Sequence, residues 1–142
     1  MMKLLQLKLI GTKEIIMGLD MYAYVVPSTA YEGEVDFETP TRFREDLAEW
    51  RKHNALHGYM EMLYYLKGGK AESFNCDNVN LTLDDLNELE KVVLSNSFEK
   101  TEGFFFGADT SDGFYKEKDM KFIADAKIAL SEGHKVYYTS WW

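Results

Sequence analysis

An α+β fold, with a small, mainly antiparallel sheet and about three helices packed on one side, is the fold class that this sequence predicts. The chain has 142 residues, which is enough for one domain with its own core. Its hydrophobic fraction of 46% and charged fraction of 28% are those of an ordinary globular protein. Strand-like segments enclose three segments with helical periodicity, and no repeat or linker interrupts them.

The first sixteen residues differ in pattern from the rest of the chain. They begin with an apolar stretch that is too short to span a bilayer and lacks a signal-peptide cleavage pattern. Lys13-Glu14 can be encoded AAGGAG, a bacterial ribosome-binding sequence, shortly before Met17. We therefore expect residues 1–16 to be an upstream extension or flexible N-terminus, and residues 17–142 to form the domain. The alternative is a genuine N-terminal strand, because leucines alternate with polar residues over 5–9.

Residues 18–26 are rich in β-forming side chains and predict the first strand. Alternation places Leu19, Met21 and Ala23 on one face. Asp20 then lies on the other face with Tyr22 and Tyr24. Residues 27–40 contain two prolines and a glycine, which predicts a loop with room for a short strand at 34–37.

A long helix is expected from about Thr41 to Gly68-Gly69, where paired glycines supply the C-terminal stop. Thr39 or Thr41 is its expected N-cap. Alternating spacings of four and three residues place one set of side chains on a single helical face that starts apolar and turns polar. This set is Phe43, Leu47, Trp50, Asn54, His57, Glu61 and Tyr64.

The second half of the chain alternates strand-like and helical segments. A short irregular strand is expected over residues 72–81, and Thr82 is the expected N-cap of the helix that follows. Leu86, Leu89 and Val93 form the apolar stripe of that helix. The remaining expected elements are the helix 83–94 itself, a strand at 103–107, a turn at 108–113, a helix at 115–131 and a strand at 135–140.

Net charge and cysteine content limit the classes of partner. A formal net charge of −8 repels nucleic-acid phosphates, so we expect no general nucleic-acid binding. No segment predicts membrane insertion. The single cysteine, Cys76, excludes an intramolecular disulfide and suits a reducing cytoplasm. An aromatic fraction of 15% and a chain that ends in two tryptophans favour a homodimer.

The polar part of the long helical face is the candidate ligand-binding site. Arg51 could bind an anion, Asn54 an amide or a base edge, and His57 a proton or a hydrogen-bond partner. Asp20 joins them if the first strand packs alongside, and it would then be the counter-charge of Arg51 or His57. Trp50 is either a core residue or a surface for stacking on a flat ligand. The alternative is that Asn54 and His57 form a satisfied buried network.

Other kinds of site have weaker support. His57 and Asp20 are the candidate catalytic residues, as an acid–base pair. No recognised metal-ligand spacing includes His53 and His57, and we expect neither metal nor cofactor. There is no GxSxG sequence, and the acidic and amide neighbours of Cys76 would not activate its thiol. Residues 109–113 could close over a pocket.

Four blocks of sequence resemble an uncharacterised family of small tailed-phage proteins that begin MGLDMY. The blocks are Met17 to Tyr22; Trp50, Arg51, Lys52, Asn54, Leu56 and His57; Gly103 to Gly107; and Tyr137, Tyr138, Ser140 and Trp142. Some look-alikes are labelled phosphoglycerate kinase. This chain is too short for that two-domain enzyme and has no glycine-rich phosphate loop that opens a helix.

The resemblance implies a phage-encoded accessory protein that acts in the cytoplasm of the bacterial host. The favoured function is non-catalytic capture of a small polar or nucleotide-like ligand, or of a host protein, with anti-defence as one possible purpose. The alternative is a small hydrolase or transferase that uses His57 and Asp20. A structural role in the virion is a third class, which the polar face gives no reason to prefer.

Overall fold

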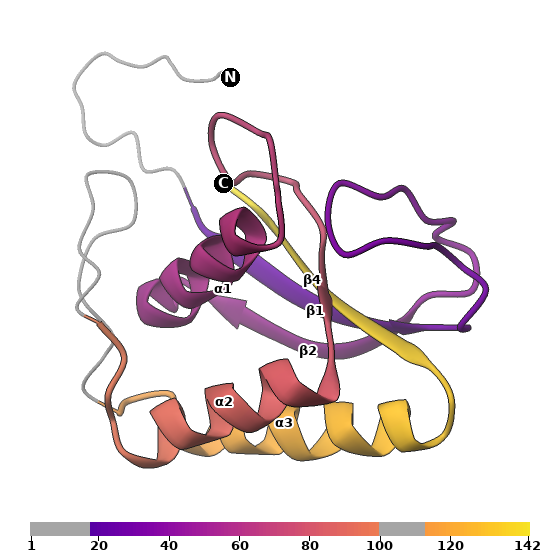
Figure 1. The fold of residues 1–142 in the computed structure, drawn as a ribbon. Coiled ribbons are helices and arrows are strands. Elements are labelled where there is room, and N and C mark those ends of the chain that lie inside the picture. The colour runs from indigo at the N-terminus through magenta and orange to yellow at the C-terminus, as the bar shows by residue number, and fades with distance from the viewer. Residues whose placement is uncertain (1–17, 100–112) are drawn as a thin grey trace.

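A computed structural model describes residues 18–99 and 113–142 (Figure 1). The predicted strand at 103–107, residues 1–16 and most of the 108–113 turn lie outside the described residues. In chain order, the elements are β1 (Asp20–Val26), β2 (Glu45–Arg51), α1 (Asn54–Leu66), β3 (Val79–Leu81), α2 (Leu83–Leu94), α3 (Lys116–Ser131) and β4 (Lys135–Trp141). The predicted α+β class is confirmed.

The four described strands form one antiparallel sheet in the order β2-β1-β4-β3. β1 and β4 are therefore central, and they pair along their whole length, from Asp20 opposite Trp141 to Val26 opposite Lys135. β2 is an edge strand whose register shifts between Ala23 and Tyr24 of β1. A bulge and acidic side chains are common on edge strands because they hinder pairing with another chain.

One face of the sheet carries the main core, and all three helices pack against it (Figure 1). Leu19, Met21 and Ala23 are fully buried there, as the alternation in β1 predicts. The helices contribute Leu56 and Met60 from α1, Leu86, Leu89 and Val93 from α2, and Phe122, Ile123 and Ala126 from α3. We call this side the helix-covered face.

The opposite side of the sheet, here called the outer face, carries a smaller aromatic cluster. The connection between β1 and β2 folds over part of it, and brings Tyr31 and Phe37 onto Tyr137 of β4. Tyr31 and Phe37 stack with their ring centroids 3.7 Å apart. Arg44 lies over the ring of Tyr24, 3.9 Å from its centroid. The rest of this face, around the beginning of β1 and the end of β2 that pairs with it, holds polar side chains.

The predicted long helix is wrong over about its first half, residues 41–53. Residues 45–51 form strand β2 instead, and α1 begins only at Asn54. Lys52 has a left-handed backbone, with φ of 59°, which breaks any continuous helix at this point. Pairing with β1 puts Trp50 opposite Met21, where its indole is buried in the core. Tertiary pairing therefore overrides the local helical pattern.

The other predicted elements agree closely with the structure. α2 has the expected Thr82 cap, and Thr82 and Asp85 form a reciprocal capping box. Gly68, with φ of 98°, follows α1 in the left-handed conformation expected of a helix stop. The strand expected at 72–81 shortens to β3, and the one expected at 34–37 shortens to a single bridge between Val35 and Val79.

No helix in the described part of the chain has both the length and the apolar character needed to cross a membrane.

Candidate functional site

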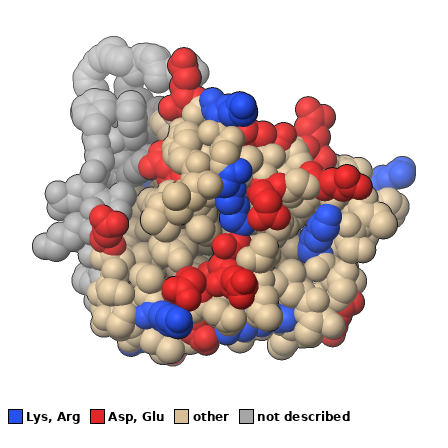
Figure 2. Space-filling model, in the orientation of Figure 1, with Lys and Arg blue, Asp and Glu red and all other residues tan. Residues whose placement is uncertain are grey.

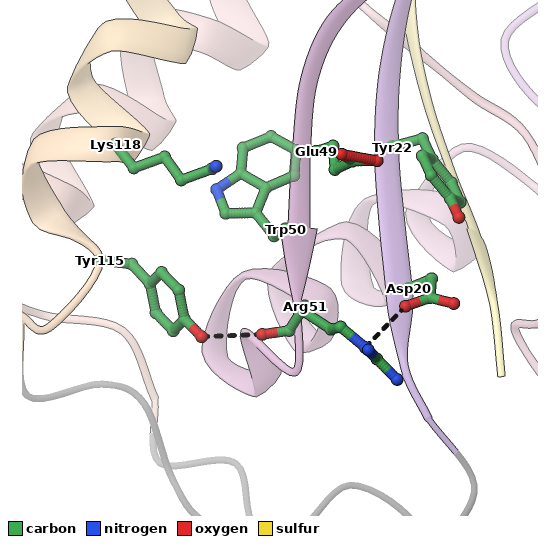
Figure 3. Close-up of a pocket in the computed structure, with 7 residues that line it drawn as sticks. All are labelled: Asp20, Tyr22, Glu49, Trp50, Arg51, Tyr115 and Lys118. Atoms are coloured by element: carbon green, nitrogen blue, oxygen red, sulfur yellow. Dashed lines mark hydrogen bonds and ion pairs between the residues drawn. The ribbon is translucent and has the colours of Figure 1, made fainter.

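A pocket of about 470 Å³ lies where the edge strand β2 meets the start of α3 (Figure 3). Its volume falls within the range of small-molecule sites in proteins. The lining comes from three elements and the residue before α3: Asp20 and Tyr22 from β1, Glu49, Trp50 and Arg51 from β2, and Tyr115 and Lys118 from the α3 region. Three of the five predicted binding residues, Asp20, Trp50 and Arg51, therefore line one pocket.

Arg51 and Asp20 are brought together by the register of the sheet, in which they are direct partners. Arg51 Nε lies 3.0 Å from Asp20 Oδ1, and the two side chains are 71% and 40% exposed. An ion pair this exposed contributes only about 0–1 kcal/mol to stability, because water screens it. A ligand can therefore take over either partner at low cost. Gly18 leaves room for the guanidinium, since a Cβ there would lie 3.0 Å from Arg51 Nη2.

Tyr115 and Lys118 enter the pocket from the other side, three residues apart and so on one side of the first turn of α3. The Tyr115 hydroxyl donates a hydrogen bond of 2.7 Å to the backbone carbonyl of Arg51. This bond fixes the beginning of α3 against the end of β2. In Figure 3 the ammonium group of Lys118 points toward the indole of Trp50. The cation thus comes from α3 and not from the predicted helical face.

Glu49 and Tyr22 complete the outer part of the pocket, and they are direct partners across β2 and β1. The Tyr22 ring stacks on Tyr24, with centroids 5.9 Å apart and planes only 13° from parallel. Burial raises the pKa of Tyr22, and the negative charges of Asp20 and Glu49 raise it further. Tyr22 is therefore a neutral phenol that offers a flat ring and a hydroxyl group.

A buried polar cluster behind the pocket fixes its inner wall. The Trp50 indole Nε1–H donates to Asp119 Oδ1 at 3.0 Å, and His53 Nε2 lies 2.7 Å from Asp119 Oδ2. The His53 ring also stacks on Tyr115, with centroids 4.2 Å apart. Trp50 and Tyr115, two residues of the lining, are thus held from behind by the same buried histidine–aspartate pair.

The predicted grouping of His57 and Asn54 with Asp20 and Arg51 is wrong in its geometry. His57 and Asn54 are buried on the helix-covered face, whereas Asp20 and Arg51 lie on the outer face. His57 Nδ1 lies 2.7 Å from the Tyr138 hydroxyl. Tyr138 pairs with Ala23, whose side chain belongs to the main core. The sheet therefore lies between His57 and Asp20, and they cannot act as an acid–base pair.

Burial also changes the chemistry of His57. It lowers the pKa of the imidazole to about 4, so that the ring is neutral at neutral pH. The neighbouring Tyr138 hydroxyl is fully buried, and its pKa is raised for the same reason. This arrangement fits the alternative that His57 belongs to a buried hydrogen-bond network.

Sequence reasoning missed four residues of the pocket: Tyr22, Glu49, Tyr115 and Lys118. Tyr22 was predicted to share the face of Asp20 but was not assigned to the site, and Glu49 joins that face only once β2 is recognised as a strand. Tyr115 and Lys118 are remote in sequence, and no spacing connects them to β1 or β2. The buried pair of His53 and Asp119 was missed for the same reason.

Metal ligation and thiol chemistry gain no support from the described residues. Within residues 18–99 and 113–142, no three or more histidine, cysteine, aspartate or glutamate side chains are grouped so that they could hold a metal ion. Cys76 is exposed, but partial burial of its thiol and the nearby charge of Asp77 raise its pKa. A raised pKa lowers the fraction of reactive thiolate at neutral pH.

Charge on the face shown in Figure 2 is mixed, with acidic side chains interspersed among basic ones and no large continuous basic area. Comparison with known proteins adds no functional relative: no family model matches the chain, and no curated protein or solved structure is significantly similar to it.

Proposed function

We propose that the protein binds a small polar ligand in the pocket between β2 and α3, without catalysing a reaction on it. The observation that carries this proposal is that the charged side chains of the lining are either unpaired with other described residues or only weakly paired. Lys118 and Glu49 form no ion pair with any described residue, and the Arg51–Asp20 pair is exposed enough to exchange partners. The pocket thus presents charged groups that a ligand can satisfy.

Binding is favoured over catalysis because neither histidine near the pocket, His53 or His57, is among its lining residues. His57 lies beyond the sheet, and His53 is 1% exposed behind the pocket with one ring nitrogen held by Asp119. The remaining polar groups of the lining, such as Arg51 and Lys118, are suited to holding a ligand in place.

The resemblance to tailed-phage proteins gives the proposed setting. A phage accessory protein with this pocket would act in the cytoplasm of the bacterial host and withdraw a small polar or nucleotide-like molecule from host defence or metabolism. Capture of a host protein is the other form of this proposal. The pocket favours the small molecule, because its charged side chains converge on one concave volume.

The test is a screen of mixed polar metabolites against the full chain, with backbone amide NMR shifts as the readout. We expect a binding ligand to shift resonances around Glu49, Arg51 and Lys118. Lys118→Gln and Glu49→Gln should each weaken that ligand. The matched controls are Lys91→Gln and Glu88→Gln on α2, which remove the same charges from an exposed pair that does not line the pocket.

The controls should leave affinity unchanged, because their side chains do not line the pocket. Ligands that shift only resonances elsewhere, or a screen in which no compound shifts these resonances, would overturn the proposal. Turnover of the bound compound that is lost in Asp20→Asn would show that the pocket is catalytic instead.

A further inference from the structure

We propose that the ligand of this pocket is a zwitterion with a flat ring, of the chemical class of an aromatic α-amino acid. The inference rests on the proposed function, and it replaces a general polar ligand with one charge pattern. It depends on which charges line the pocket, on which elements carry them, and on the rings that stand beside them.

The lining contains two cations and two anions, and its formal charge therefore sums to zero. Arg51 and Lys118 are the cations, and Asp20 and Glu49 are the anions. The chain as a whole carries a net charge of −8, so the lining is less acidic than the protein it belongs to. Two opposite pairs in one concave volume complement a ligand that also carries both signs.

A ligand that is only anionic fits this lining less well. The phosphate of a nucleotide could take up Arg51 and Lys118, but its charge would then face Asp20 and Glu49 in the same pocket. Like charges at short range repel, and water screens them less in a concavity than on open surface. A zwitterion avoids this conflict, because its carboxylate can pair with the cations while its ammonium group pairs with the anions.

The positive and negative groups that remain for a ligand lie on different elements of the pocket. Asp20 is already bonded to Arg51, so the free partners that remain are Lys118 on α3 and Glu49 on β2. In Figure 3 the Lys118 side chain extends from α3 toward Trp50 and the strands, while Glu49 lies on the side nearer β1. A ligand seated between them meets a cation on one side and an anion on the other.

Two tyrosines supply the surface for the ring. Tyr115 is held by its stack on His53 and by its bond to the Arg51 carbonyl, and Tyr22 by its stack on Tyr24. In Figure 3 they lie on either side of Arg51. Rings that are already fixed lose little conformational entropy when a ligand ring packs against them. An aromatic zwitterion therefore uses both the charges and the rings.

Calorimetric titration of the full chain with three indoles of similar shape and one nucleotide tests this inference. The probes are L-tryptophan, tryptamine without the carboxylate, indole-3-propionate without the ammonium group, and adenosine monophosphate. We expect L-tryptophan to bind about tenfold more tightly than either singly charged indole, because each loses one set of charge-assisted hydrogen bonds. Adenosine monophosphate should bind more weakly than L-tryptophan.

Two variants assign the charges. Glu49→Gln should remove most of the preference for L-tryptophan over indole-3-propionate, and Lys118→Gln should remove most of the preference over tryptamine. Glu88→Gln and Lys91→Gln should leave both preferences as they are. A general loss of packing would weaken the binding of all three indoles equally. The two affinity ratios therefore measure the effect of each charge alone.

The contradicting results separate this inference from the proposed function. Equal affinity for the zwitterion and a singly charged indole, or tighter binding of adenosine monophosphate at the same residues, would overturn the inference and leave a ligand-binding pocket. If no indole binds, the inference also fails. The proposed function fails only if the wider metabolite screen shifts no resonance of the pocket.

Discussion

Nε2 of His53 and Oδ2 of Asp119 lie 2.7 Å apart inside the protein, and neither side chain is more than 2% exposed. The other oxygen of Asp119 accepts the hydrogen bond from Trp50. One carboxyl group in the first turn of α3 thus joins this helix to the end of β2 and to the residue that precedes α1. This connection sets the distance between the two sides of the pocket.

Removing the carboxyl group should therefore destabilise the whole domain. We expect Asp119→Ala to lower the free energy of unfolding by about 3–5 kcal/mol, the usual cost of leaving a buried charged or hydrogen-bonded partner unpaired. Asp119→Asn should cost less, because the amide keeps the shape and its oxygen can still accept from Trp50. Urea denaturation followed by fluorescence measures both values.

Asp125→Ala on the same helix is the control, because Asp125 forms an ion pair with the largely exposed Lys121. Its expected cost is below about 1 kcal/mol. If Asp119→Ala costs no more than this control, the buried pair does not hold α3 in place.

Two leucines of α2 test the assignment of the helix-covered face. Leu86 is fully buried, whereas Leu83 is 52% exposed one turn earlier. Leu86→Ala should lower the free energy of unfolding by about 2–5 kcal/mol, because it empties a core position. Leu83→Ala should change it by less than about 0.5 kcal/mol. Similar shifts of the denaturant midpoint for both variants would show that α2 is rotated from the position described.

The sequence predicted the fold class correctly because most elements carry their own signals. Thr82 and the apolar stripe of α2 define that helix locally, and the alternation in β1 defines its buried side. β2 carries no such signal: Glu45–Arg51 has the composition of an exposed helix. It becomes a strand only by pairing with β1, an interaction between distant residues that no local pattern reports.

The same error explains the outcome at the site. A continuous helix would place Trp50 and Asn54 one turn apart on one face. In the structure Trp50 lies near the end of a strand and Asn54 begins a helix. Arg51 therefore faces the outer side of the sheet, whereas Asn54 and His57 are buried on the helix-covered face. Asp20 and Arg51 still meet, because they are partners in the register. Lys118 could not be predicted, since only the packing of α3 brings it there.

The homodimer remains a prediction, and the C-terminus suggests how to test it. Trp142 is fixed by hydrogen bonds to Phe74 and Asn75, whereas Trp141 is 68% exposed on the outer face. Light scattering of the wild-type chain should give about twice the monomer mass of 16.5 kDa. If Trp141 lies in the interface, Trp141→Ser should shift the mass toward the monomer. A wild-type mass near 16.5 kDa at micromolar concentration would contradict the dimer.

Gly69 should tolerate no side chain. A Cβ at this position would lie 2.3 Å from the ring of Tyr64, and that ring cannot retreat because its hydroxyl donates to Asp36 and accepts from two backbone N–H groups. We expect Gly69→Ala to lower the free energy of unfolding by about 1–3 kcal/mol through overpacking. Gly18→Ala is the matched control, since its Cβ meets only the mobile end of Arg51. Equal melting temperatures for the two variants would contradict this packing.

The pH dependence of stability should identify His57 as a structural residue. Its pKa is about 4 in the folded protein, because of burial, against 6.5 for an ordinary imidazole. Between these values the unfolded chain binds a proton that the folded protein does not, so the free energy of unfolding falls as the pH falls from about 6.5 to 4. The contribution of His57 to this loss is about 3 kcal/mol, from a difference of 2.5 pKa units.

Urea denaturation of the wild type and of His57→Gln across this pH range measures the contribution as the difference between the two slopes. The carboxyl groups titrate in both proteins and therefore cancel. His57→Gln should also lower stability at pH 7 by about 1–3 kcal/mol, because it disturbs the bond to the buried Tyr138 hydroxyl. Parallel curves for His57→Gln and the wild type would show that His57 reaches water, and that it is still available to a ligand.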